Sequence, residues 1–118
     1  QSISLLLDPN IYETQICSAR TFGFLKDVRE LRKKGLALGG SLNNAVVLDE
    51  NKVLNKEGIR FSDEFVRHKL LDFIGDISLS GYRILGSFYS SHTGHNLNYQ
   101  LIKKIFETPD SWELICSN

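Results

Sequence analysis

Three side chains that can bind a metal or move a proton stand at every fourth position of residues 65–76, FVRHKLLDFIGD. If this stretch is helical, His68, Asp72 and Asp76 project from one face of the helix. Four residues of helix rise about 6 Å, a span across which an imidazole and a carboxylate can converge on one metal ion. A histidine and an aspartate at this spacing also form surface ion pairs, so both interpretations stay open at this point.

Two further clusters contain residues suited to chemistry or binding. His92 and His95 flank Gly94 in residues 91–98, SHTGHNLN, where a helix is expected to begin. These histidines can act as acids or bases, or can serve as ordinary loop and capping residues. Residues 35–49, GLALGGSLNNAVVLD, combine small side chains with an apolar run. Such a stretch is typical of a space beside an apolar wall and equally of a tight turn that leads into a strand.

Helices and single strands must position these residues, and they are mixed along the chain. Apolar spacing and turn residues predict helices at 25–34, 63–79 and 95–107, and a short helix from the turn at 8–10 to Cys17. Apolar runs between turn residues predict strands at 2–7, 45–49, 52–54, 82–90 and 112–116, with a turn at Glu50–Asn51. This mixture predicts an α+β fold, a two-layer sandwich of a mixed β-sheet and α-helices.

The charge balance and the cysteine content argue against several classes of function. The 118 residues include 14 Lys and Arg and 14 Asp and Glu, so the net charge is zero and no basic surface for nucleic acid is indicated. No apolar run approaches the roughly 18 residues of a membrane span, and no signal peptide is expected. Cys17 and Cys116 are predicted to be reduced, partly buried thiols of a cytoplasmic protein. The sequence contains no Met, from which we expect a cut inside a longer protein.

Five motifs occur in a characteristic order. They are ARTFGF at 19–24, LALGGSLNNAVVLD at 36–49, VLNKEGIRF at 53–61, FVRHKLLDFIGD at 65–76 and GHNLN at 94–98. Together they resemble the UDP-3-O-acyl-N-acetylglucosamine deacetylase family of lipid A (lipopolysaccharide) biosynthesis in Gram-negative bacteria. The resemblance runs from about Ser2 to Phe106, and the ordered series is far more specific than any single motif. It implies a zinc-dependent hydrolase that removes an N-acetyl group by cleaving an amide C–N bond.

The resemblance also implies a domain organisation and a set of site residues. The family has two similar α+β domains with the active site between them, and residues 1–118 correspond to the second. His68 and Asp72 match the two zinc ligands of that domain. His95 matches its active-site histidine, and Asp76 matches the carboxylate that orients the histidine.

The substrate is expected to meet other parts of the chain. Lys69 matches a residue that contacts substrate, and Thr21 matches a hydroxyl placed near the reacting carbonyl. About residues 21–48 correspond to a βαβ insert that forms a passage for the acyl chain. The residues that match the lining of this passage are Val28, Ala37, Ser41, Ala45 and Val47, with Phe22 and Phe24 near its entrance.

Two features limit what the chain is expected to do alone. The family's third zinc ligand, a His, and its general-base Glu belong to the first domain, which this sequence lacks, so the isolated chain is expected to be inactive. His92 stands where the resemblance leads us to expect a Lys or Arg that meets charged groups of the substrate.

The expected cofactor is Zn²⁺. The expected partners are UDP-linked acylated N-acetylglucosamine and the N-terminal domain of the same enzyme, with no nucleic acid and no transmembrane segment.

Two other functions are compatible with the residues themselves. The domain can be a non-catalytic module that binds an acyl chain or a partner through its insert. It can also be purely structural, with His68 and Asp72 as an ion pair. Zinc content of the protein that includes the first domain separates these possibilities, and acyl-chain binding without zinc would favour the binding module.

Overall fold

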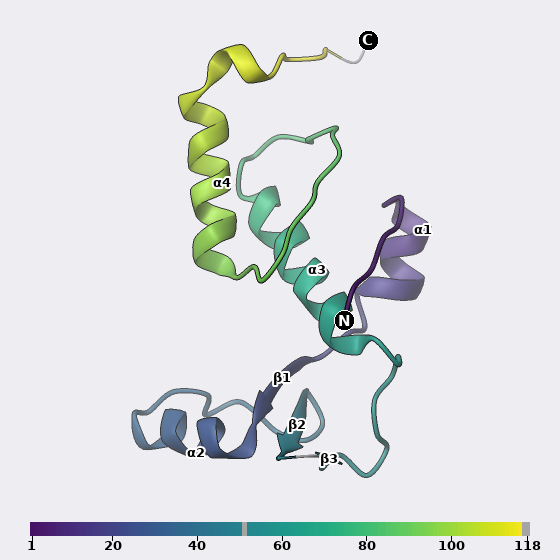
Figure 1. The fold of residues 1–118 in the computed structure, drawn as a ribbon, viewed down its shortest axis with the longest axis vertical. Helices are drawn as coiled ribbons and strands as arrows, with labels where there is room; N and C mark the ends of the chain where they lie inside the picture. Colours follow the sequence, from purple (N-terminus) through teal and green to yellow (C-terminus); the bar gives the residue numbers. More distant parts are fainter. Residues whose placement is uncertain (51, 117–118) are drawn as a thin grey trace. The chain divides into compact units, whose positions relative to one another are not determined.

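The computed structural model describes residues 1–50 and 52–116. This part of the chain contains four α-helices, two short helical turns and one three-stranded sheet, joined by loops (Figure 1). The chain divides into two units, residues 1–68 and 69–118. Helix α3 (Glu64–Ser78) starts in the first unit and ends in the second. The mixed sheet and the separate helices confirm the α+β class that the sequence predicts.

The first unit begins with an extended segment and a short helix. The strand predicted at residues 2–7 is wrong, because this segment is irregular and pairs with no strand among the described residues. The short helix predicted to reach Cys17 is confirmed, since α1 (Pro9–Ile11) continues into the π-helical turn η1 (Tyr12–Ile16). Asp8 caps this helix, because its Oδ1 accepts a hydrogen bond of 2.7 Å from the amide three residues further on.

The sheet consists of a βαβ unit followed by a short antiparallel strand. β1 (Thr21–Phe24) pairs in parallel with β2 (Ala45–Asp49), and α2 (Leu25–Lys33) lies between them in the sequence. Parallel neighbours need such a crossover, so the βαβ arrangement predicted for about residues 21–48 is present. β3 (Lys52–Val53) then pairs antiparallel with the end of β2.

Strand alternation sorts the side chains of β1 and β2 onto two faces of the sheet. Residues paired in the register share a face, so Thr21 and Gly23 lie on the same face as their partners Ala45 and Val47. Helix α2 covers this face, because a Cβ atom built on Gly23 would meet Cγ2 of Val28 at 3.6 Å.

The opposite face is more apolar and is anchored by a buried amide nearby. It carries Phe22, Phe24, Val46 and Leu48. Val46 is fully buried. Asn55, which is 5% exposed, fixes the start of β2. Its Oδ1 accepts from the Val47 amide at 2.9 Å, and its Nδ2 donates to the carbonyls of Leu42 and Ala45, each at 2.8 Å.

A buried ion pair joins the start of β1 to the start of α3. Nε of Arg20 lies 2.9 Å from Oε1 of Glu64, and a second guanidinium nitrogen lies 3.2 Å from Oε2. Glu64 also accepts hydrogen bonds from the backbone amides of Arg20 and Arg60, at 3.0 and 2.6 Å. The guanidinium donates further to Glu57 and to the Gly58 carbonyl. Both partners are buried, so their charges are compensated by each other and by these bonds.

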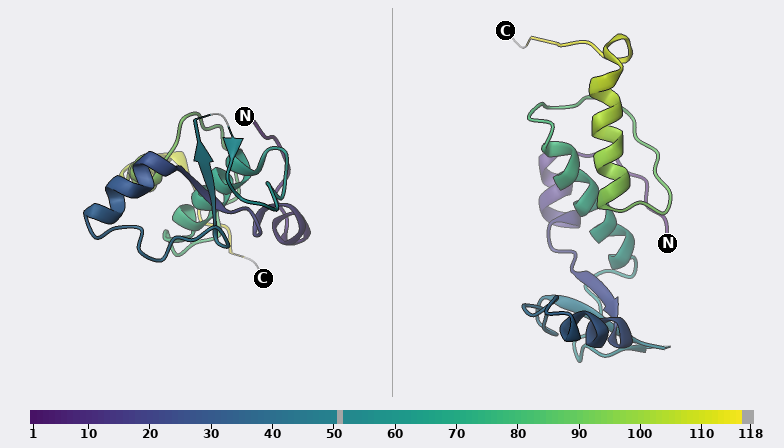
Figure 2. Two further views of the ribbon diagram at one scale, coloured as in Figure 1. Left: turned by 90° about the horizontal axis from the view of Figure 1, so that it is seen from below. Right: turned by 90° about the vertical axis from the view of Figure 1, so that its left-hand side faces the viewer.

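In the second unit, the C-terminal part of α3 lies beside α4 (His95–Glu107), as Figures 1 and 2 show. A long loop returns the chain between the two helices. Phe73 and Ile77 of α3 are buried, and the Phe73 ring packs against Phe88 of the loop with centroids 5.2 Å apart. The helix α4 ends just before η2 (Pro109–Ser111), because proline cannot continue the helical hydrogen bonds.

Helices and strands differ in how well the sequence predicts them. The helices predicted at 25–34, 63–79 and 95–107 are confirmed. The strands predicted at 82–90 and 112–116 are wrong, because both segments are irregular. A strand needs a backbone partner as well as an apolar pattern, and neither segment has one among the described residues. Leu85 and Tyr89, which the pattern assigned to a strand, are 83% and 96% exposed.

The two cysteines differ from the prediction in their exposure to solvent. Cys17 and Cys116 are free, but both are exposed instead of partly buried. The Sγ of Cys17 donates to the Glu13 carbonyl at 3.0 Å.

Within residues 1–50 and 52–116, no helix has both the length and the apolar character to cross a membrane. Asn51, part of the predicted turn, lies outside the described residues.

Candidate active site

Helix α3 carries His68, Asp72 and Asp76 at successive turns. All three side chains are half-buried, and their four-residue spacing puts them on one face of the helix. The helix forms here because apolar residues recur on its other positions, where Phe73 and Ile77 are buried. A row of one imidazole and two carboxylates is thus held on a regular backbone.

Asp76 receives two hydrogen bonds from the first turns of α4. Nδ1 of His95 lies 2.8 Å from Oδ2 of Asp76, and Nδ2 of Asn98 donates to the same oxygen at 2.8 Å. A carboxylate only accepts, so Nδ1 carries the proton and Nε2 is the ring nitrogen left for a ligand. Burial raises the pKa of Asp76, but the hydrogen bonds from Asn98 and His95 outweigh burial and hold this pKa below its ordinary value.

Phe22 of β1 packs its ring against α3. Its centroid lies 4.7 Å from that of Phe65 and 6.4 Å from that of His68, with the latter two ring planes at 82°. Edge-to-face contacts of this kind are a favourable arrangement of aromatic rings. The residue expected near the entrance of an acyl passage therefore touches the histidine expected to bind zinc.

Lys69 lies beside the carboxylate expected to bind zinc. Its Nζ is 3.6 Å from Oδ2 of Asp72, and the two side chains are 43% and 17% exposed. An ammonium group has three donors on a flexible stem, so this lysine can serve Asp72 and a second anion at once.

The donor set fits zinc but is incomplete within this chain. An imidazole nitrogen and a carboxylate oxygen are common zinc ligands, and catalytic zinc sites use three protein ligands. His68 and Asp72 would supply two. Across the described residues, no group of three or more His, Cys, Asp or Glu side chains lies close enough together to hold a metal ion. This geometry is compatible with a third ligand from elsewhere in a longer protein.

The residues expected to line an acyl passage do not all lie together. Ala45 and Val47 share the face of the sheet that α2 covers, and Val28 of α2 packs on that face. Phe22 and Phe24 lie on the opposite face. The structure therefore gathers three of the apolar lining residues and separates them from the two phenylalanines.

Ala37 and Ser41, also expected in the lining, lie in the loop after α2. Both are exposed, and Ala37 adopts a left-handed backbone with φ 53°. The backbone amide of Ser41 donates to Oδ1 of Asn44 at 2.8 Å, which tightens the loop before β2.

Thr21 and His92 are each held in their own local setting. Thr21 is exposed, and strand alternation directs its side chain away from the face on which Phe22 meets His68. His92 has a left-handed backbone with φ 53°, and its Nδ1 lies 2.8 Å from Oγ of Ser91 in the loop before α4.

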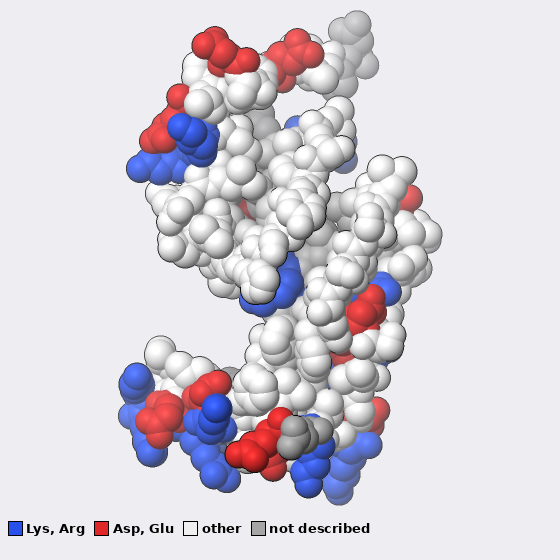
Figure 3. All heavy atoms as spheres, viewed as in Figure 1, with Lys and Arg blue, Asp and Glu red and all other residues white. Residues whose placement is uncertain are grey.

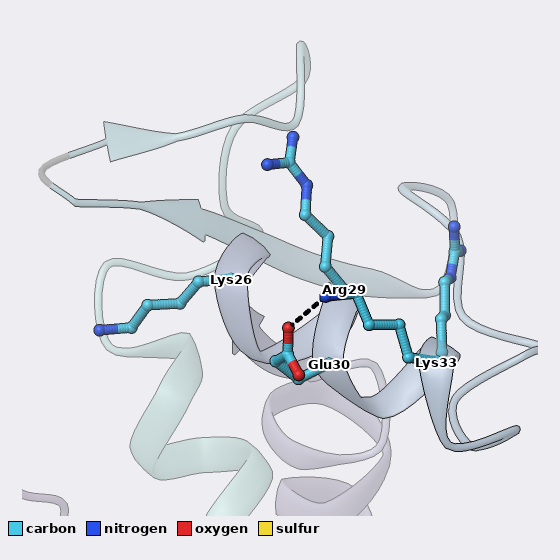
Figure 4. Close-up of a pocket in the computed structure, with 5 residues that line it drawn as sticks. Lys26, Arg29, Glu30 and Lys33 are labelled. Carbon is cyan, nitrogen blue, oxygen red and sulfur yellow. Dashed lines mark hydrogen bonds and ion pairs between the residues drawn. The ribbon is translucent and has the colours of Figure 1, made fainter.

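Figure 3 shows several groups of Lys, Arg, Asp and Glu side chains, one of which lies over α2. A shallow hollow there is lined by Lys26, Arg29, Glu30, Arg32 and Lys33 (Figure 4). The dashed line in Figure 4 marks the ion pair of 2.8 Å between Glu30 and Lys33. None of the residues singled out from the sequence lines this hollow, and its long exposed side chains are typical of a solvated helix face.

Known proteins match almost the whole chain. Residues 1–107 match the family of UDP-3-O-acyl N-acetylglycosamine deacetylases. The chain is 56% identical over 112 residues to the UDP-3-O-acyl-N-acetylglucosamine deacetylase of Syntrophus aciditrophicus (strain SB), a match covering 95% of this chain and 36% of the relative. It is 51% identical over 115 residues to the protein of the same name from Campylobacter jejuni subsp. jejuni serotype O:23/36 (strain 81-176), covering 98% and 39%. For that of Wigglesworthia glossinidia brevipalpis, identity is 50% over 113 residues, covering 96% and 38%.

This chain belongs to the UDP-3-O-acyl N-acetylglycosamine deacetylase family. It spans 36–39% of the length of these three relatives, so each of them contains a large part that this chain lacks. The resemblance recognised from five motifs is thereby confirmed at the level of the family.

Three polar residues of this deacetylase-family chain have buried contacts that the sequence does not predict. Asn98 contacts Asp76, and it lies three residues after His95, a spacing that puts both on one face of α4. Arg20 and Asn55 each belong to one of the five motifs, but a single polar residue in a sequence does not indicate what it contacts. Their buried contacts become visible only in the fold.

Proposed function

We propose that this chain is the C-terminal domain of a zinc-dependent deacetylase that removes the N-acetyl group from UDP-3-O-acyl-N-acetylglucosamine in lipid A biosynthesis. The observation that carries the proposal is the 2.8 Å contact between Asp76 and His95. Asp76 lies on α3, the helix that also bears His68 and Asp72. Membership of the deacetylase family supports the choice of reaction. The reaction is hydrolysis of an amide, and its products are acetate and a free amine on the sugar.

His68 and Asp72 would hold the metal ion of this site. Bound zinc lowers the pKa of a coordinated water to about 7 and polarises the acetamide carbonyl, two groups that are otherwise unreactive at neutral pH. The third ligand, a His, and the general base, a Glu, would come from the N-terminal domain of the same enzyme. The isolated chain is therefore proposed to be inactive.

His95 is proposed to act on the negative charge that develops at the carbonyl oxygen. The imidazolium carries protons on both nitrogens, so it can keep Nδ1–H on Asp76 and offer Nε2–H to the oxyanion. The same proton can pass to the leaving amine. Asp76 orients the ring through its contact with Nδ1. The His95 side chain is 73% exposed, so a substrate can reach Nε2.

Other residues are proposed to hold the substrate. Lys69 would meet the anionic diphosphate, and Thr21 would place its hydroxyl near the reacting carbonyl. The acyl passage would be lined by Val28, Ala37, Ser41, Ala45 and Val47, with Phe22 and Phe24 near its entrance. We place the enzyme in the cytoplasm as part of the same proposal.

The test uses the full-length protein with UDP-3-O-acyl-N-acetylglucosamine. Acetate release and zinc content are measured together, before and after treatment with a chelator. We expect acetate release to stop when zinc is removed and to return when zinc is added. Binding of the acyl chain without acetate release by zinc-loaded protein would instead make the domain a binding module. A protein that does neither would leave His68 and Asp72 as a structural pair.

A further inference from the structure

Asn98 is a buried polar residue next to the proposed active site. It is the fourth residue of α4 and is 2% exposed. Its Nδ2 donates to Oδ2 of Asp76 at 2.8 Å, and Nδ1 of His95 contacts the same oxygen at 2.8 Å. One carboxylate oxygen thus receives two donors from a single helix, one from a buried amide and one from an exposed ring.

The two donors differ in how firmly they can hold the carboxylate. The His95 side chain is 73% exposed, so its ring lacks surrounding atoms that would fix its position. The terminal torsion of an aspartate is broad, so a carboxylate with one mobile partner can rotate. Asn98 is packed on nearly all sides, and its amide gives Oδ2 a fixed place. The orientation of the His95 ring therefore depends on Asn98 through Asp76.

The chemical type of Asn98 also suits this place. A primary amide donates a hydrogen bond without adding a charge. A Lys or Arg at this position would pair with Asp76 and compete with the imidazole for its negative charge. The amide lowers the pKa of Asp76 and so favours the carboxylate, while it leaves the full negative charge facing His95.

We propose that Asn98 is a positioning residue, which holds the Asp76 carboxylate so that His95 presents Nε2 to the substrate. This inference rests on the deacetylase function proposed for the same site. Hydrogen-bond partners of metal ligands typically contribute about 10- to 100-fold to activity, and we expect an effect of similar size here. The effect should fall on kcat and leave KM and zinc content unchanged, because Asn98 touches neither substrate nor a proposed zinc ligand.

The experiment compares Asn98→Leu, which has a similar size but no donor, with wild type in the full-length enzyme. Asn98→Asp is the second variant, in case the leucine disturbs folding: it keeps the size of the side chain and should also lower kcat, because a carboxylate cannot donate to Asp76. Asn96→Ala is the matched control, because Asn96 is an exposed amide on the same turn of α4. We expect kcat to fall about 10- to 100-fold for Asn98→Leu and to stay unchanged for Asn96→Ala.

A double-mutant cycle separates positioning from a general structural role. In a His95→Ala background, Asn98→Leu should lower kcat no further, because its effect passes through the ring. An equal fold-loss in both backgrounds would overturn the proposal, and so would an unchanged kcat.

Nitrogen resonances of the His95 ring give a readout that does not need activity. In the neutral ring of wild type the proton should be on Nδ1, whereas Asn98→Leu should show a mixture of the Nδ1–H and Nε2–H tautomers. An unaltered ring spectrum in Asn98→Leu would overturn the inference even if the protein proves to have no deacetylase activity.

Discussion

Arg20 and Glu64 form a two-point ion pair across 44 residues of sequence, with Nε to Oε1 at 2.9 Å and a second nitrogen to Oε2 at 3.2 Å. Arg20 directly precedes the strand that carries Phe22, and Glu64 begins the helix that carries His68. The pair therefore fastens together the two segments whose rings meet at the proposed site. Charged groups that are 5% and 0% exposed tolerate loss of a partner poorly.

Removing one partner of this pair should destabilise the protein strongly. Arg20→Met leaves the Glu64 carboxylate buried without its cation, and breaking a buried pair in this way typically costs about 3–5 kcal/mol. The free energy of unfolding, measured by urea denaturation, checks the prediction. Lys33→Met is the matched control, since Lys33 pairs with Glu30 in the solvent and should change stability little. Similar losses of unfolding free energy in both variants would show that the buried pair stabilises the fold no more than the exposed pair does.

The same pair should make stability depend on pH in the acidic range. Burial raises the pKa of Glu64, but hydrogen bonds from Arg20 and from the Arg60 amide outweigh burial, so this pKa lies below its ordinary value. Such a carboxyl group stabilises the fold above its ordinary pKa of about 4.3 and loses that contribution as the pH falls through the folded value.

Glu64→Gln cannot titrate at this position, so it isolates the contribution of Glu64. Between about pH 7 and pH 3.5, wild type should lose more unfolding free energy than Glu64→Gln does. Other carboxyl groups with lowered pKa values, such as Asp63 beside Arg67, titrate in both proteins and cancel in the comparison. Parallel pH curves would contradict the prediction.

The helices of this chain could be predicted because their signals are local. Apolar spacing, the turn at residues 8–10 and the glycines that follow α2 and α3 all lie within or next to the segments they specify. The strands predicted at 2–7, 82–90 and 112–116 failed for the opposite reason. Their apolar patterns are real, but strand formation depends on a partner that is distant in sequence, and no local pattern supplies that information.

In the proposed site, too, only the features that depend on local spacing could be predicted from the sequence. The row of His68, Asp72 and Asp76 follows from spacing on one helix. The contact of Asp76 with His95 spans 19 residues, and spacing alone could not have predicted it. The resemblance to a family led us to expect that pair. Neither route pointed to Asn98, because its role depends on burial, which appears only in the folded chain.

A larger side chain at Ala45 should act on the acyl chain of the substrate. Ala45 shares the face of the sheet covered by α2, so Ala45→Phe would fill space near Val28 and Val47. In the full-length enzyme, kcat/KM should fall more for long-acyl substrates than for truncated ones, by about 0.8 kcal/mol for each methylene that is no longer buried. Asn43→Phe, in the exposed loop before β2, is the control. Equal losses for long and short chains would mean that Ala45 does not line the passage.

Zinc binding should require both residues of α3 and the rest of the enzyme. His68→Ala or Asp72→Ala should abolish zinc retention by the full-length protein, measured as metal content after dialysis, because each removes one of three proposed ligands. Asp110→Ala, an exposed carboxylate beyond α4, is the control. The isolated chain should bind zinc weakly, since it supplies two of the ligands. Tight one-to-one binding by the isolated chain that survives His68→Ala would contradict the assignment.

Loss of His95 should impair catalysis without loss of the metal. Its Nδ1 is engaged by Asp76 at 2.8 Å, and its Nε2 is the nitrogen proposed to meet the oxyanion. His95→Ala should lower kcat roughly 10²- to 10⁴-fold, which corresponds to about 3–5 kcal/mol of barrier. Asp76→Asn should have a milder effect, because the imidazole remains but loses its charged partner. Asn96→Ala, which removes an exposed amide one residue further along α4, is the matched control and should keep its kcat. Zinc content measured on the same samples decides the role: if His95→Ala strips the metal, His95 is a ligand, and if kcat is unchanged, its contact with Asp76 is structural.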